Sequence, residues 1–213
     1  MKKLLMTIMT GTILTACGSD AVKATDVPAG DSTAIATTPV VAEVMATSYN
    51  VSTTESVLNW KGSAVGKSHN GTVAVKSGAV QVEGTNVVGG TVVFDMTTIV
   101  SLDLEGEYKG KLEGHLKAAD FFNVDSFATA TIVVKSVNAG NVTADLTIKN
   151  VTKSITFPAE VAVTETEIKV NATLTINRTD FGVVYGSGNF FDLAKDKAIS
   201  DDIEFTVVVR ATK

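Results

Sequence analysis

Hydrophobic and polar residues alternate with a period of two over most of the chain after residue 49. The clearest run is residues 168–177, where every second residue is apolar and every residue between them is polar or charged. Strict alternation of this kind predicts a half-buried strand of an antiparallel sheet. Less regular runs predict further strands at 57–65, 71–75, 79–82, 87–96, 129–137, 142–148, 154–163 and 203–211.

Short turn sequences separate these predicted strands. They are Ser77-Gly78, Glu83-Gly84, Asn138-Ala139-Gly140-Asn141 and Lys149-Asn150. Eight or nine strands joined by tight turns predict an all-β domain, either a barrel or a sandwich. Pro158 must lie at an edge, a bulge or a strand start, because proline cannot donate to a ladder.

One segment departs from the alternation and predicts a short amphipathic helix over residues 107–119. Its expected inner face has spacings of three and four residues and comprises Tyr108, Leu112, His115, Leu116 and Ala119. Two internal glycines each cost such a helix about 1 kcal/mol relative to alanine. We therefore expect it to persist only by packing on the sheet, as a plug or lid. Residues 181–198, rich in glycine and aromatic residues, predict a long loop.

The first 16 residues have the layout of a secretory signal peptide. Lys2 and Lys3 precede an apolar run of residues 4–14, and small residues lead to Cys17. As a helix that run would span about 16 Å, roughly half of a bilayer core, so it is too short for a transmembrane span. Leu-Thr-Ala before the lone Cys17 resembles the lipobox of bacterial lipoproteins. The resemblance implies cleavage before Cys17 and fatty acylation, with palmitate as one acyl group; the alternative is an ordinary secreted protein.

Residues 17–48 predict a flexible tether that joins Cys17 to a folded domain at 49–213. All nine Phe, the one Trp and the three Tyr lie at or after Tyr49, so the residues able to build a core begin there. By resemblance to enterobacterial sorting, Gly18 after the cysteine is not a signal for inner-membrane retention. We expect an exported protein, lipid-anchored in the cell envelope at the outer membrane and facing the periplasm.

Composition excludes several classes of protein. Charged residues make up 19% and hydrophobic residues 45% of the 213 residues, which excludes wholesale disorder. A net charge of -5 gives no broad attraction for nucleic acid. One cysteine excludes an internal disulfide, and two histidines make a multi-histidine metal centre hard to assemble. We therefore expect no metal and no other cofactor.

Few side chains are candidates for chemistry. His69 and His115 are either structural histidines or general bases paired with Asp103 or Asp120. No thiol remains for nucleophilic catalysis once Cys17 serves as the anchor, and no G-x-S-x-G sequence is present. Arg178, near Asp180, is expected either to bind a ligand headgroup or to pair with that carboxylate.

Several segments together resemble the YceI-like family of lipid or polyisoprenoid binding proteins. They are residues 58–62 (LNWKG), 67–71 (KSHNG), 94–96 (FDM), 111–124 (KLEGHLKAADFFNV) and 178–182 (RTDFG). The resemblance covers nearly all of 49–213. It implies a lipocalin-like antiparallel barrel of eight or slightly more strands with one short helix and a long apolar chain inside, and it carries no catalytic residues.

These observations predict a membrane-tethered, non-enzymatic carrier of a polyisoprenoid, quinone-like or fatty-acyl molecule. The expected partners are that lipid ligand and the membrane, not nucleic acid, and a homodimer is compatible with the sequence. The predicted apolar lining is Trp60, Phe94, Leu116, Phe121, Phe127, Leu174, Ile176, Phe181 and Phe205, and the predicted polar mouth is Lys67, His69, Arg178 and Asp180. Two alternatives are a structural or adhesive envelope module with a filled core and a histidine-dependent enzyme.

Overall fold

The computed structural model describes residues 45–192 and 198–213. The predicted signal peptide, Cys17 and most of the predicted tether lie outside the described residues, as does part of the aromatic loop. The strands are β1 (Thr47–Val51), β2 (Val57–Ala64), β3 (Lys67–Glu83), β4 (Asn86–Ser101), β5 (Thr129–Asn138), β6 (Asn141–Ile148), β7 (Val151–Val163), β8 (Glu167–Asn177) and β9 (Ile199–Thr212). The helices are α1 (Gly106–Lys117) and the short 3-10 helix η1 (Arg178–Phe181).

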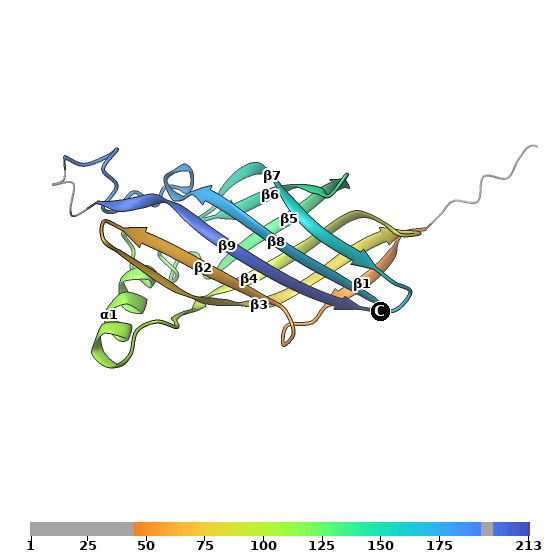
Figure 1. The fold of residues 1–213 in the computed structure, drawn as a ribbon, viewed down its shortest axis with the longest axis horizontal. Helices are drawn as coiled ribbons and strands as arrows, with labels where there is room; N and C mark the ends of the chain where they lie inside the picture. Colours follow the sequence, from red (N-terminus) through yellow and green to blue (C-terminus); the bar gives the residue numbers. More distant parts are fainter. Residues whose placement is uncertain (1–44, 193–197) are drawn as a thin grey trace, which may run out of the picture. The chain divides into compact units, whose positions relative to one another are not determined.

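Eight of the strands close into an antiparallel barrel (Figure 1). They follow the order β3-β2-β9-β8-β7-β6-β5-β4, and β4 pairs with β3 again to complete the circle. The predicted barrel is therefore confirmed and the sandwich is wrong. Because side chains alternate between the two faces of each strand, closure directs one apolar set from every strand toward the barrel axis.

The ninth strand, β1, lies in line with β2 along the same two neighbours. β2 pairs with the first half of β3, whereas β1 pairs with Ala79 to Val82 and with the last residues of β9. Where the chain leaves the ladder between β1 and β2, the Ser56 hydroxyl donates to the Arg210 carbonyl at 3.3 Å and accepts from its N–H at 3.0 Å. Alternation did not predict β1, and its first two residues belong to the predicted tether.

Tyr49 of β1 closes the end of the barrel opposite the β2–β3 turn. Its side chain is 3% exposed, and its hydroxyl donates to the Thr164 carbonyl at 2.9 Å in the turn between β7 and β8. Buried valines from β1, β3 and β9 surround it in the same core cluster. This end is therefore packed with the protein's own side chains.

The prediction of two strands separated at Ser77-Gly78 is wrong, because β3 runs through that dipeptide without a break. A Cβ on Gly78 would lie 2.7 Å from the Thr91 carbonyl oxygen and 2.9 Å from Val51 Cγ2. The glycine thus allows β4 and β1 to approach β3 closely, beside a register shift. The Lys149-Asn150 signal does form a turn, since both residues have positive φ, as a two-residue type I′ hairpin requires.

The predicted helix is confirmed at nearly its predicted bounds, and it lies near the β2–β3 turn in Figure 1. Leu112 and Leu116 pack against the core cluster, but the expected inward place of Tyr108 is wrong, since its side chain is 74% exposed. The Ser101 N–H donates to Glu113 Oε1 at 2.8 Å and so joins the end of β4 to the helix. Within the described residues, no helix is long and apolar enough to span a membrane.

We predict that Gly71→Ala destabilises the barrel by at least about 2 kcal/mol, through overpacking at the β2–β3 ladder. A Cβ there would lie 1.8 Å from the Val100 carbonyl oxygen and 2.6 Å from the Trp60 ring. Gly62→Ala is the matched control, because nothing lies within 4 Å of its Cβ position. The free energy of unfolding in urea should change by under about 0.5 kcal/mol for this control. Equal losses for both variants would contradict the packing assigned to Gly71.

Candidate functional site

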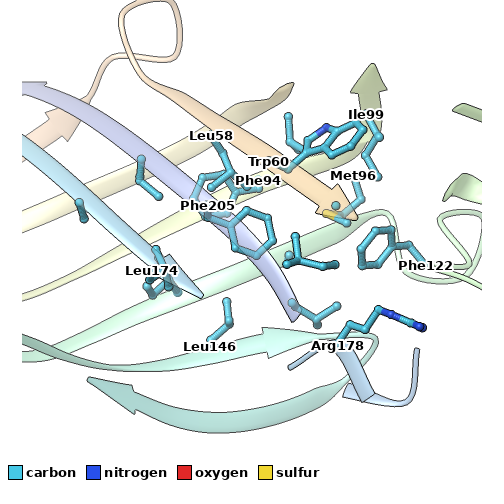
Figure 2. A pocket seen from close by; sticks show the side chains of 18 of the residues that line it. Leu58, Trp60, Phe94, Met96, Ile99, Phe122, Leu146, Leu174, Arg178 and Phe205 are labelled. Carbon is cyan, nitrogen blue, oxygen red and sulfur yellow. The ribbon is translucent and has the colours of Figure 1, made fainter. Parts of the chain in front are cut away.

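The barrel encloses a cavity of about 640 Å³. Side chains from all eight barrel strands, from α1 and from η1 line it. Figure 2 shows Leu58, Phe205 and Leu174 pointing from different strands toward a common space, with Arg178 and Phe122 to one side of it. A cavity of this size falls within the range of small-molecule sites. The hollow does not fit the filled core expected of a structural module, which would contain only scattered voids.

The cavity exists because the inward faces of opposite strands do not meet. Six inward apolar residues that line the cavity, Leu58, Ile132, Val170, Leu174, Phe205 and Val207, pack on the core yet are only partly buried. Small residues widen the space further, since Gly62, Ala64 and Ala172 all line the cavity. The alternating apolar positions therefore form walls, and the remaining space suits an apolar ligand.

Polar groups of the lining gather at one end of the cavity, which we call the mouth. They are Ser63, Lys67, His69, His115, Arg178, Tyr185 and Ser200. These residues come from the end of β2, the start of β3, α1, η1, the following loop and the start of β9, which adjoin the same end of the barrel. Apolar residues such as Val87, Val137 and Val161 line the other end. The cavity is thus amphipathic along its length.

His69 is held at the mouth by a carboxylate. Its Nδ1 lies 2.7 Å from Asp103 Oδ2, while Asp103 Oδ1 accepts from the Asn70 N–H at 3.0 Å and from the Ser101 hydroxyl at 2.9 Å. Partial burial alone would raise the pKa of Asp103, but the hydrogen bonds from Asn70, His69 and Ser101 outweigh it and lower this pKa to about 2. Asp103 is therefore ionised at neutral pH and fixes the imidazole ring.

Arg178 performs a structural task at the mouth. Its guanidinium donates to the carbonyl oxygens of Ser200, Val183 and Ile199 at 2.9, 2.7 and 3.2 Å, and to Asp201 Oδ1 at 3.2 Å. The side chain is 1% exposed; burial lowers its pKa, and the Asp201 carboxylate opposes that shift. The predicted pairing with Asp180 is wrong, since Asp180 is exposed and Asp201 takes its place.

Asp201 connects this arginine to the aromatic loop. Besides Arg178, its carboxylate accepts from the Ser187 hydroxyl at 3.0 Å and from the Asn189 side-chain amide at 2.6 Å. The loop places Tyr185 in the cavity wall and leaves Phe190 and Phe191 exposed by 58% and 48%. The buried ion pair therefore positions one wall of the mouth.

The two histidines differ in their surroundings. His115 packs between the rings of Tyr185 and Phe121, with ring centroids 4.4 and 5.4 Å away. The enzyme alternative needs a histidine within hydrogen-bonding reach of a carboxylate beside a cleft, and His69 with Asp103 meets this geometric condition. Among residues 45–192 and 198–213, however, no serine, threonine or lysine side chain is hydrogen-bonded to His69. The pair therefore lacks the adjacent nucleophile of a covalent catalyst.

The structure brings most of the predicted site residues to the cavity. Its lining includes Trp60, Phe94, Leu116, Phe121, Leu174, Phe205, Lys67, His69 and Arg178. It does not include Ile176 and Phe181, which are buried in the core, half-buried Phe127, or exposed Asp180. Sequence reasoning missed Met96 and Phe157, although alternation within their predicted strands placed each on the inward face. It gave no signal for Asp201.

The fold and cavity define a lipocalin-like antiparallel barrel with an internal apolar site. Residues 49–211 match the YceI-like domain, and the chain belongs to the YceI-like family. Its fold is similar to that of BcnA from Burkholderia cenocepacia, with a TM-score of 0.56 and 20% identity over 76% of this chain and 99% of that one. It is also similar to a polyisoprenoid binding domain from Saccharophagus degradans implicated in plant cell wall breakdown, with a TM-score of 0.56 and 18% identity over 77% and 97% of the two chains.

A relative by sequence comes from Staphylococcus aureus. A UPF0312 protein of Staphylococcus aureus strain MSSA476 is 35% identical over 106 residues, which is 45% of this chain and 61% of that protein. The match therefore spans less than two thirds of the relative's length.

We predict that Asp201→Ala destabilises the protein by about 3 kcal/mol or more, because it leaves the buried Arg178 guanidinium without its counter-charge. Asp202→Ala removes the same group from an exposed neighbouring residue and should cost under about 0.5 kcal/mol. Urea unfolding measures both free energies, and hydrogen exchange should show the loss of protection centred on the amides of Val183 and Ile199. Similar stability of the two variants would refute the role assigned to Asp201.

Proposed function

We propose that this protein binds the apolar tail of a polyisoprenoid, quinone-like or fatty-acyl molecule inside its barrel. The observation that carries the proposal is the apolar cavity of about 640 Å³ inside the barrel, with polar groups at one end only. Membership of the YceI-like family and the fold shared with a polyisoprenoid binding domain support it. Such an amphipathic cavity matches a molecule with a long tail and a compact headgroup.

Energetics favour long tails and weak discrimination between them. Each buried methylene contributes about 0.8 kcal/mol, so a five-carbon isoprene unit contributes about 4 kcal/mol before any cost is subtracted. Eight such units would exceed the observed ceiling of about 20 kcal/mol for non-covalent affinity, so tail contributions cannot simply add. We therefore propose selection by tail class and headgroup more than by tail length.

The proposed role is that of a carrier or scavenger held at a membrane. In this proposal Cys17 is acylated, residues 18–48 are the tether, and the barrel faces the periplasm from the outer membrane. The supporting observations are the lipobox-like sequence, the lone cysteine and the absence of aromatic residues from 18–48. Two or three acyl chains suffice for stable anchoring, whereas one chain binds a membrane only marginally.

We predict that Leu174→Trp lowers the affinity for tailed ligands at least tenfold, because a larger ring would occupy the middle of the cavity. Leu174 lines the cavity, whereas Thr175 is exposed on the outer face of β8, so Thr175→Trp is the matched control. The measurement is binding of a prenol and of a fluorescent polyene fatty acid to delipidated full-length protein. A ligand at 100 times its Kd should also raise the stability of the wild type by about 2.7 kcal/mol. Lack of binding by every tail class would refute the proposed function.

We predict that Cys17→Ser abolishes membrane attachment when the whole chain is expressed in a Gram-negative host. Without its thiol the residue cannot receive the diacyl group that holds the protein on the bilayer. Cell fractionation and intact-mass analysis should find the wild type acylated in the membrane fraction. The barrel's tail affinity should not change. Recovery of an unmodified wild-type protein from the soluble fraction would contradict the anchor while leaving the binding proposal intact.

A further inference from the structure

Among the described residues, the cavity wall contains basic side chains and no acidic ones. Lys67, His69, His115 and Arg178 line the cavity, whereas no aspartate or glutamate of the described chain does so. All four lie at the mouth, on β3, α1 and η1. A tail-binding barrel needs no basic side chains to hold hydrocarbon, so those at the opening whose donors are not already used within the protein point to the part of the ligand that remains there.

His69 has one ring nitrogen committed and one available. Asp103 is ionised and therefore carries no proton to donate, so Nδ1 of His69 must be the donor in their 2.7 Å contact. Within residues 45–192 and 198–213, Nε2 has no hydrogen-bond partner. The ring is thus oriented from behind by a carboxylate, with its second nitrogen free to contact a ligand.

Lys67 supplies a second free donor on the same wall. It precedes His69 by two residues on β3, so both side chains lie on the inward face of that strand, and both line the cavity. Among the described residues, Lys67 has no carboxylate within ion-pair distance. Arg178 differs, because carbonyl oxygens and Asp201 already occupy its donors.

Gly62 leaves room beside these two donors. It is the direct cross-strand partner of His69 on β2, and Ala64 is the partner of Lys67. Nothing lies within 4 Å of the position that a Cβ on Gly62 would take. A headgroup therefore has space next to the imidazole without any displacement of the wall.

We propose that Lys67 and His69 form a subsite for an anionic headgroup, either a carboxylate or a phosphate monoester, of the amphiphile whose tail lies in the cavity. This inference rests on the proposed tail-binding function. An ammonium and an imidazolium both donate charge-assisted hydrogen bonds to such oxygens. An anion favours the protonated ring, whose Nε2 then donates to it, whereas a neutral alcohol gains no charge interaction with either residue.

The test compares ligands that share a tail and differ in headgroup. Delipidated full-length protein is titrated with hexadecanoate against hexadecanol, and with geranylgeranyl monophosphate against geranylgeraniol. We expect the anionic member of at least one pair to bind about tenfold more tightly than its alcohol. The pair that shows the larger difference identifies the headgroup as a carboxylate or a phosphate. Raising the salt concentration from about 50 mM to about 500 mM should weaken binding of the anion and leave the alcohol unaffected.

Variants assign the effect to the two residues. Lys67→Gln and His69→Gln should each lower the affinity for the anion about fivefold to tenfold and change that for the alcohol by less than about twofold. Lys76→Gln is the control, because it removes the same charge from an exposed position on the same strand that does not line the cavity. Urea unfolding midpoints verify that each variant is folded. Because Lys67 is exposed, the Lys67→Gln variant tests the subsite without disturbing the His69–Asp103 contact.

The outcomes separate this subsite from the function on which it rests. Equal affinity for acid and alcohol, or equal losses for both in the two variants, would overturn the anionic subsite and leave tail binding standing. Tighter binding of the alcohol would likewise overturn it in favour of a neutral headgroup. If no probe of either class binds, the proposed function itself fails.

Discussion

The width of an eight-stranded barrel governs this molecule. Eight strands enclose a space that side chains only just fill when large residues point inward, and smaller inward residues leave a hollow. Here glycine and alanine at Gly62, Ala64 and Ala172 occupy inward positions, and about 640 Å³ remains unfilled. At about 24 cal/mol per Å³, a dry void of that size would cost about 15 kcal/mol, as much as the whole stability of an ordinary domain. A fold with this wall composition is therefore suited to contain something besides its own side chains.

The two ends of the barrel are stabilised by different interactions. At one end Tyr49 and the valines around it seal the core with apolar packing and one hydrogen bond to the β7–β8 turn. At the mouth, the helices and loops that do not belong to the sheet must be held in place without strand pairing. Charged side chains do this by donating to backbone carbonyls: Arg178 binds three of them, and Lys149 Nζ donates to those of Phe121 and Gly182 at 2.9 and 3.2 Å. The mouth is thus built from polar contacts that leave its inner surface open.

The periodicity of the sequence predicts which strand residues line the cavity, but it does not predict the contacts that build the ends of the barrel. The alternation over 168–177 places Val170, Ala172 and Leu174 on the cavity side, because a two-residue period fixes which face each side chain occupies. It also placed Ile176 in the lining, but Ile176 lies in the core cluster, since alternation gives the face of a strand and not the depth along the barrel. Asp201 acts through a partner 23 residues away in the chain, and no local pattern announces such a contact. Asp103, 34 residues from His69, was one of the two carboxylates expected beside a histidine. Ser77-Gly78 was interpreted as a turn from its local sequence. The glycine instead allows two other strands to approach β3 closely, and this role depends on tertiary structure.

The apolar walls and the polar mouth can also discriminate between different parts of a ligand. An apolar wall gains free energy from nearly any hydrocarbon in proportion to the area it covers, and so it distinguishes tails mainly by whether they fit. Polar donors at the mouth act differently, because a headgroup that fails to satisfy them leaves a group unpaired at a fixed position. In the proposed function, the headgroup would therefore be selected at the end where His69 and Lys67 lie, while the apolar walls would hold the tail.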